Sequence, residues 1–124
     1  MDKGAHIRFG QAGEAAALKF LQKKGYRILE QNFRTKAGEI DLVAEQEGVL
    51  VFVEVKARTG MEFGGPARSV TLQKQKRLAR TARQFLARNA IRERSCRFDV
   101  VTLVGDPGNP KSWKIDLLAD AFRL

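Results

Sequence analysis

Residues 38–56 read GEIDLVAEQEGVLVFVEVK. Both halves of this stretch are rich in apolar and β-branched residues, and the central Glu47-Gly48 pair can form a two-residue hairpin turn in which Gly48 takes a positive φ. In the second half, valine at every other position (Val51, Val53 and Val55) indicates that the strand is covered on that face as well. The stretch therefore predicts a β-hairpin buried inside a larger sheet.

The turn determines which polar side chains of the hairpin face one another. A two-residue turn places Asp41 opposite Glu54 and Glu39 opposite Lys56, with the Cβ atoms of opposed residues roughly 5 Å apart. Two carboxylates and an ammonium group are therefore expected to gather at the end of the hairpin away from the turn. Two other interpretations stay open. Glu39 and Lys56 can form an ordinary ion pair beside a solvated Glu54, and a one-residue slip in register would put Asp41 and Glu54 on opposite faces.

The expected cluster has the composition of a metal site. Neighbouring carboxylates repel each other, and in a partly dry site one of them would have to take up a proton. A divalent cation removes this repulsion, and two carboxylates with a nearby backbone carbonyl suit Mg²⁺ or Mn²⁺. Lys56 can orient or deprotonate a metal-bound water, or stabilise charge that develops on a phosphate. These groups are the ones that metal-assisted phosphodiester hydrolysis requires.

The remainder of the chain predicts helices and further strands around the hairpin. Residues 9–24 are rich in alanine, contain no proline and end before Gly25, which is typical of a helix with a glycine stop. Glu14 lies on the apolar side of this helix. The other predicted elements are strands at residues 26–34, 38–45, 49–57, 97–104 and 112–117, a helix at residues 71–90, and loops at residues 59–66 and 106–110. The order α-β-β-β-α-β-β predicts an α/β fold with a mixed sheet flanked by helices.

Composition excludes several classes of protein. A chain of 124 residues predicts one domain spanning residues 1–124. One cysteine and one histidine exclude an internal disulfide and a zinc site within the chain. The longest apolar run, residues 49–53, is too short to span a bilayer, and the N-terminus has no apolar signal core. We therefore expect a cytoplasmic protein with no membrane partner and no small-molecule cofactor.

The positive charge is concentrated in one segment. Residues 67–97 hold ten Lys or Arg residues and one Glu, an excess that equals the net charge of +9 of the whole chain. Such a patch is typical of nucleic-acid binding, although a solvated helix face is the alternative. The residues of the helix that we expect to contact phosphates are Lys74, Lys76, Arg77, Arg80 and Arg83.

Several blocks of the sequence resemble a known family. Asp41, followed after a hairpin by Glu54-Val55-Lys56 and preceded by a helical Glu14, resembles the PD-(D/E)xK nuclease pattern. The blocks GEIDL and FVEVKAR are also similar to those of the bacterial YraN family of proposed endonucleases, as are NFR and RFDV. That family is distantly related to the archaeal Holliday-junction resolvases. The resemblance runs from about Gly10 to Val104, and it departs from the pattern where Ile40 replaces proline before Asp41.

This resemblance implies a restriction-endonuclease-like core and assigns roles by position. Asp41 and Glu54 would hold the metal with the backbone carbonyl of Val55, and Lys56 would act on the attacking water. Glu14 would complete the acidic set, directly or through water, although a helix-surface carboxylate is the alternative. Arg34 and Arg58 would hold the scissile phosphate or simply solvate the strand ends. The resolvase relatives also suggest a homodimer.

The expected function is therefore that of a Mg²⁺- or Mn²⁺-dependent endodeoxyribonuclease that acts on branched or structured DNA. The basic helix would contact backbones without reading bases, because phosphate contacts carry no direct sequence information. Two other functions stay open: a non-catalytic DNA- or RNA-binding module that keeps the nuclease fold, and an RNA-processing enzyme, since both polymers present the same phosphate charge.

Overall fold

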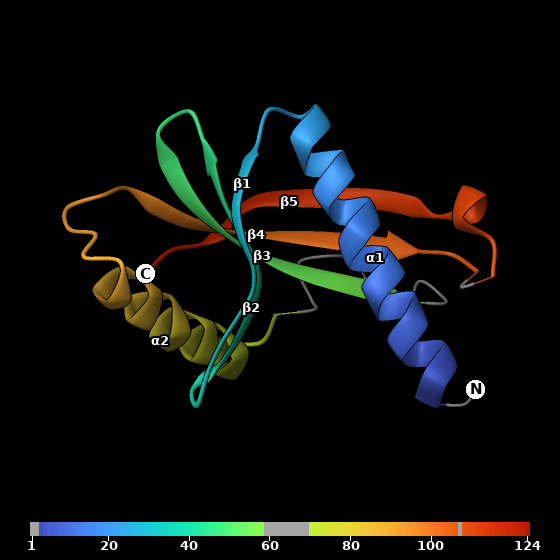
Figure 1. The fold of residues 1–124 in the computed structure, drawn as a ribbon, viewed down its shortest axis with the longest axis horizontal. Coiled ribbons are helices and arrows are strands. Elements are labelled where there is room, and N and C mark those ends of the chain that lie inside the picture. Colours follow the sequence, from blue (N-terminus) through green and yellow to red (C-terminus); the bar gives the residue numbers. More distant parts are fainter. Residues whose placement is uncertain (1–2, 59–69, 107) are drawn as a thin grey trace.

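The computed structural model describes residues 3–58, 70–106 and 108–124, with side chains described from residue 11 onward. Its helices and strands follow the predicted order (Figure 1). They are α1 (Lys3–Lys23), β1 (Arg27–Thr35), β2 (Gly38–Gln46), β3 (Val49–Arg58), α2 (Leu72–Arg88), β4 (Cys96–Val104), the 3₁₀ turn η2 (Pro110–Ser112) and β5 (Lys114–Phe122). The predicted loop at residues 59–66 lies outside the described residues.

The strands form one five-stranded mixed sheet. They lie side by side in chain order, β1-β2-β3-β4-β5. Strands β3 and β4 are parallel and every other neighbouring pair is antiparallel. A parallel pair needs a long crossover connection, and α2 lies in the segment that provides it. The mixed sheet with its two helices confirms the predicted α/β class and is consistent with a restriction-endonuclease-like fold.

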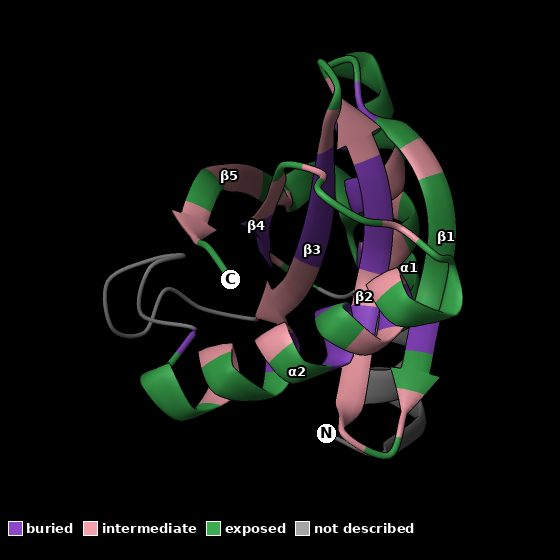
Figure 2. Cartoon of the chain, turned by 90° about the vertical axis from the view of Figure 1, so that its left-hand side faces the viewer, coloured by how far each residue is buried: buried purple, intermediate pink, exposed green. Residues whose placement is uncertain are grey.

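Each face of the sheet packs against one helix, so the protein has two hydrophobic cores (Figure 2). Because side chains alternate along a strand, each central strand contributes residues to both cores. On β3, Leu50 and Phe52 pack in the α2 core, whereas Val51 and Val53 pack in the α1 core. The helices contribute Leu78, Ala82 and Phe85 to the α2 core and Ala17 and Leu21 to the α1 core. The central strands are thus buried on both faces, as the hairpin sequence predicts.

The ends of α1 and β5 differ from the sequence expectations in informative ways. Helix α1 ends where Gly25, at φ 91°, allows the Tyr26 N–H to reach the Leu21 carbonyl at 3.0 Å, the glycine stop that was predicted. It begins at Lys3, earlier than expected, because the residues before Phe9 contain no proline. Strand β5 continues to Phe122, beyond the predicted end, because pairing with β4 resumes at Phe98 after an irregularity.

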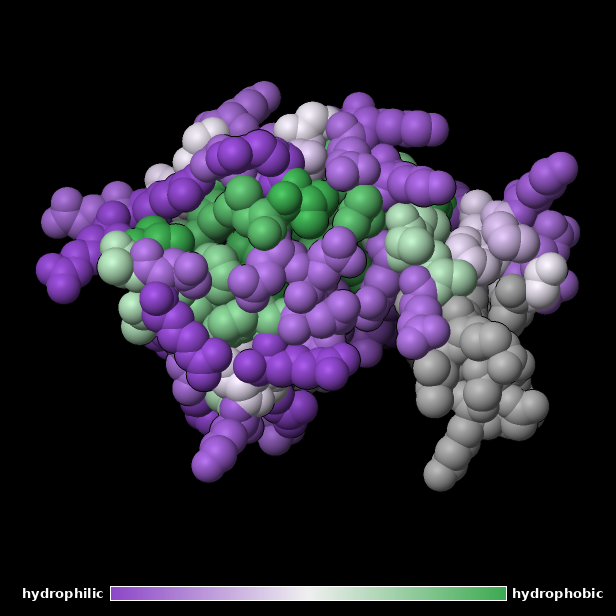
Figure 3. All heavy atoms as spheres, in the orientation of Figure 1, coloured by the Kyte–Doolittle hydropathy of each residue, from purple (hydrophilic) through white to green (hydrophobic). Residues whose placement is uncertain are grey.

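Among the described residues, neither helix combines the length and the apolar character that a membrane-spanning segment needs. Hydrophilic side chains surround a smaller hydrophobic area on the face seen in Figure 3.

Candidate functional site

Strands β2 and β3 separate at Asp41. The Glu47-Gly48 turn has positive φ at both residues, 49° and 81°, and the β2–β3 ladder has the predicted register as far as the pair Leu42–Val53. At the next position the Oδ2 atom of Asp41 accepts a hydrogen bond from the Val55 N–H at 2.7 Å. A side chain there replaces a backbone acceptor. The two strands consequently run apart, as Figure 1 shows.

This division corrects one detail of the predicted hairpin. The direct pairs Asp41–Glu54 and Glu39–Lys56 lie beyond the end of the β2–β3 ladder and do not form. Instead, Glu39 pairs with Arg34 on β1, whose Nε lies 3.3 Å from the Glu39 carboxylate. The cross-strand ion pair between Glu39 and Lys56, one of the alternatives considered above, is therefore absent from the described residues.

Strand β2 also loses its regular alternation at Asp41. Residues two apart on a regular strand face the same side, yet Ile40 packs in the α2 core and Leu42 in the α1 core. Asp41 is the residue between them, so its side chain leaves the strand where the backbone changes face. A position of this kind, next to both helical layers, can be reached from α1 as well as from α2.

Helix α1 brings a third carboxylate to Asp41. Gly13 is buried, and a Cβ atom built on it would lie 3.2 Å from the Cβ of Ala57, so the helix backbone lies very close to β3. The next residue is Glu14, which is half-buried. One carboxylate oxygen from each of Glu14, Glu39 and Asp41 lies within 4.8 Å of the other two. Glu14 is thus part of an acidic cluster and not an isolated surface carboxylate.

The electrostatics of the cluster favour a bound cation. Burial raises the pKa of Asp41 to about 7, and the charge of Glu54 adds to the increase. Burial also raises the pKa of Glu14, with a contribution from Glu39. Hard oxygen donors that repel one another in this way match the ligand preference of Mg²⁺ and Mn²⁺.

Glu54 and Lys56 lie on the other side of Asp41, and α2 adds a residue to them. The Nζ atom of Lys56 lies 3.7 Å from Oε1 of Glu54, and the Nζ atom of Lys74 lies 2.6 Å from the same oxygen. Burial and the neighbouring Lys74 lower the pKa of Lys56. Lys74 was predicted as one of several DNA-contacting residues on the helix surface. It is half-buried at the carboxylates because it lies on the part of α2 that faces the sheet.

Sequence reasoning gave no role to Asn32. This residue lies on β1 between the pairs Gln31–Leu42 and Phe33–Ile40, which places it level with Asp41, and its φ is 53°. Its amide forms a hydrogen bond with Glu14 that lowers the pKa of that carboxyl. The signal was available in the NFR block, since asparagine tolerates the left-handed region better than most residues.

The other residues predicted to contact phosphates lie on strands of the sheet or on helix α2. Arg34 is paired with Glu39 of the acidic cluster, whereas Arg58 ends β3 with its carbonyl accepting the Gly105 N–H at 3.1 Å. Arg77 is exposed, and its stem lies against Gly38 at the β1–β2 turn. The remaining three, Lys76, Arg80 and Arg83, are exposed on α2.

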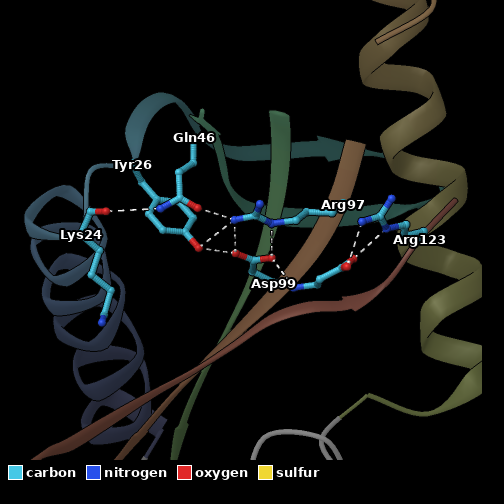
Figure 4. Close-up of polar contacts among 7 residues, drawn as sticks. Lys24, Tyr26, Gln46, Arg97, Asp99 and Arg123 are labelled. Carbon is cyan, nitrogen blue, oxygen red and sulfur yellow. Dashed lines mark hydrogen bonds and ion pairs between the residues drawn. The ribbon is translucent and has the colours of Figure 1, made fainter. Parts of the chain in front are cut away.

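A second buried carboxylate, Asp99, belongs to a structural network (Figure 4). It accepts hydrogen bonds from the Tyr26 hydroxyl at 2.6 Å, from Nε of Arg97 at 3.0 Å and from the Asp120 N–H at 2.8 Å. Burial and the hydrogen bond to Asp99 raise the pKa of Tyr26 to about 12. Because its oxygens join β4 to β5 and to Tyr26, the residue just before β1, Asp99 has a structural role.

Comparison with known proteins gives the family. The model of "Uncharacterised protein family UPF0102" matches residues 13–103, which run from the middle of α1 to the last residue but one of β4. The chain is 50% identical over 115 residues to a UPF0102 protein of Symbiobacterium thermophilum, covering 93% of this chain and 96% of the relative. It is 43% identical over 116 residues to a UPF0102 protein of Prosthecochloris aestuarii, covering 91% of each chain. The protein therefore belongs to the UPF0102 family, which is the YraN family that its sequence blocks resemble.

Proposed function

We propose that this protein is a Mg²⁺- or Mn²⁺-dependent endonuclease that hydrolyses phosphodiester bonds in branched or structured DNA. The observation that carries the proposal is the convergence of Glu14, Glu39 and Asp41 within 4.8 Å, beside Glu54 and two lysines. A DNA-binding surface alone has no use for a half-buried acidic cluster in which the pKa values of Glu14 and Asp41 are raised. Perturbed titratable groups of this kind are characteristic of functional sites.

The residues of the site divide into ligands and a proton acceptor. Asp41, Glu54 and Glu14 would hold the cation together with the Val55 carbonyl, and the Val55 N–H fixes the orientation of Asp41. Such a cation supplies Lewis-acid activation of water and phosphate. Lys56, whose pKa is lowered, is suited to orient the attacking water and to accept its proton.

Lys74 would compete with a bound metal ion for Glu54. Its Oε1 atom is paired with Lys74 at 2.6 Å, so a metal ion at Glu54 would require Lys74 to release it. The released ammonium group would then be available to a DNA phosphate at the same place. Lys74 in this way links the carboxylates to the basic helix, which would position DNA through its backbone.

The test is a cleavage assay on a panel of labelled DNAs: four-way junction, flap, single strand and plain duplex. Each would be incubated with Mg²⁺, Mn²⁺ or EDTA. Asp41→Asn and Lys56→Met should abolish metal-dependent cutting. The matched controls Glu45→Gln, on the same strand but paired with Arg27 and Arg94, and Lys19→Met, on exposed α1 surface, should not.

The alternative of a non-catalytic binding module gives a different result. Tight binding to the panel with no cutting under any metal, and affinity unchanged by Asp41→Asn, would rule out the stand-alone nuclease and favour the module.

A further inference from the structure

A groove lies between the outer side of α2 and the end of β5, away from the carboxylates. It measures about 380 Å³ and is lined by Leu72, Lys76, Arg80, Arg83, Phe122 and Leu124 among others. The end of the chain comes close to α2 in this region, as Figure 1 shows. The proposed function uses the cations of α2 to contact DNA backbones and assigns no role to the apolar residues beside them.

One wall of the groove is a row of cations that form no ion pair with the described residues. Lys76, Arg80 and Arg83 are exposed, and none of them has an ion pair with another described residue. The neighbouring Arg123 is different, because it is held by Asp120 at 2.9 Å. From residue 76 to residue 83 the helix rises about 10 Å. A row of that length can contact neighbouring phosphates of one strand.

The groove also has large apolar side chains in its lining. The large hydrophobic side chains that are exposed in the described part of the chain are Leu29, Leu72 and Leu124, and two of these three line the groove. Leu72 is 67% exposed and Leu124 is 44% exposed. Phe122 lies beside them, with its ring stacked on Phe98 at 4.4 Å between centroids.

Cations beside apolar side chains distinguish between two forms of nucleic acid. A duplex presents phosphates to a protein surface and keeps its bases stacked inside, so it gains from cations alone. A single strand presents phosphates and unstacked bases together, and it gains from a charged row next to an apolar floor. The groove has both features side by side.

We infer that this groove binds a short run of single-stranded nucleic acid, with phosphates at Lys76, Arg80 and Arg83 and bases against Leu72, Phe122 and Leu124. Under the proposed function, on which this extension to substrate class rests, the preferred substrates are those with an unpaired strand next to a duplex, such as a flap or a splayed arm. Binding itself does not depend on cleavage and is measured separately from it.

The experiment is fluorescence anisotropy in EDTA, where no metal-dependent cleavage occurs, with a labelled single-stranded oligonucleotide and a hairpin duplex of equal phosphate number. The double variant Leu72→Ala/Leu124→Ala should weaken single-strand binding roughly 3- to 10-fold and leave duplex binding unchanged. Arg80→Ala/Arg83→Ala should weaken single-strand binding more strongly. The matched controls are Leu29→Ala, the exposed leucine outside the groove, and Arg92→Ala, an exposed arginine outside it. Both should behave as wild type.

Three outcomes would overturn the inference. The first is an unchanged single-strand affinity in the leucine variant, and the second is an equal loss of affinity for the duplex in that variant. The third is displacement of the labelled oligonucleotide by a polyglutamate peptide at a lower concentration of negative charge than unlabelled oligonucleotide requires, which would indicate an acidic-peptide site. Failure of the nuclease proposal looks different: no cutting by wild type, with groove-dependent binding of the single strand retained.

Discussion

The Nζ atom of Lys74 lies 2.6 Å from Oε1 of Glu54, which places a cation of helix α2 among the carboxylates at the division of the sheet. A metal ion that uses Glu54 has to displace this ammonium group. Lys74→Met removes the competitor, and we expect it to raise Mn²⁺ affinity by about 3- to 10-fold in calorimetric titration. Lys74→Arg keeps the charge and should leave the affinity close to wild type. A lower affinity in Lys74→Met would contradict competition between Lys74 and the metal ion for Glu54.

Metal binding should depend on pH through Asp41. Its pKa is raised to about 7, chiefly by burial, and a protonated carboxyl cannot serve as a ligand. Below pH 7 a proton competes with the metal ion for the Asp41 carboxylate. The apparent Mn²⁺ affinity should therefore fall by about tenfold for each unit by which the pH is lowered. Above that pH it should level off. Calorimetric titrations with Mn²⁺ between pH 5.5 and 8.5 would reveal this dependence. An Mn²⁺ affinity that stays constant over that range would indicate that the Asp41 carboxyl has an ordinary pKa.

The same carboxylate should destabilise the metal-free protein. Because the pKa of Asp41 is higher in the folded state than its ordinary value of 3.8, the unfolded state binds fewer protons between those two pH values. The free energy of unfolding therefore falls as the pH rises from about 4 to about 7. Asp41→Asn keeps an acceptor for Val55 and removes the charge, so it should raise the free energy of unfolding at pH 7.5 by about 1–3 kcal/mol in EDTA.

Urea denaturation measures this gain, and the same variant should lose Mn²⁺ binding. Glu45→Gln is the control of opposite sign, because Arg27 and Arg94 lower the pKa of Glu45 and its charge is favourable. A drop in stability for Asp41→Asn would contradict the electrostatic account of the site.

Asn32 should affect the stability of the protein through its backbone conformation and Mn²⁺ binding through its side-chain amide. At φ 53° a residue with a Cβ atom is strained, and asparagine tolerates this region better than alanine. Asn32→Ala should cost about 1 kcal/mol more in unfolding free energy than Asn32→Gly, which accepts a positive φ. Both variants lose the hydrogen bond to Glu14, so both should weaken Mn²⁺ binding to a similar degree. Equal stability of the two would show that the backbone is unstrained.

The sequence predicts the fold and much of the acidic site because both depend on local patterns. The register of the β2–β3 hairpin follows from the period-two pattern and the Glu47-Gly48 turn, and the structure confirms it as far as Leu42 and Val53. The end of the ladder could not be predicted, since it depends on a side chain, that of Asp41, replacing a backbone acceptor. The contact between Lys74 and Glu54 was equally inaccessible. It is set by how far α2 is displaced and rotated relative to β3, which periodicity alone does not specify.

The long crossover between β3 and β4 has a consequence for how the chain folds. Strands β1, β2 and β3 are joined by short turns, so their contacts are local and can form early. This early meander would bring the charges of Asp41 and Glu54 together before α2 docks with the neutralising Lys74. Its formation is then opposed by repulsion that later steps relieve. Salt screens such repulsion, and the refolding rate of the metal-free protein should therefore increase with ionic strength.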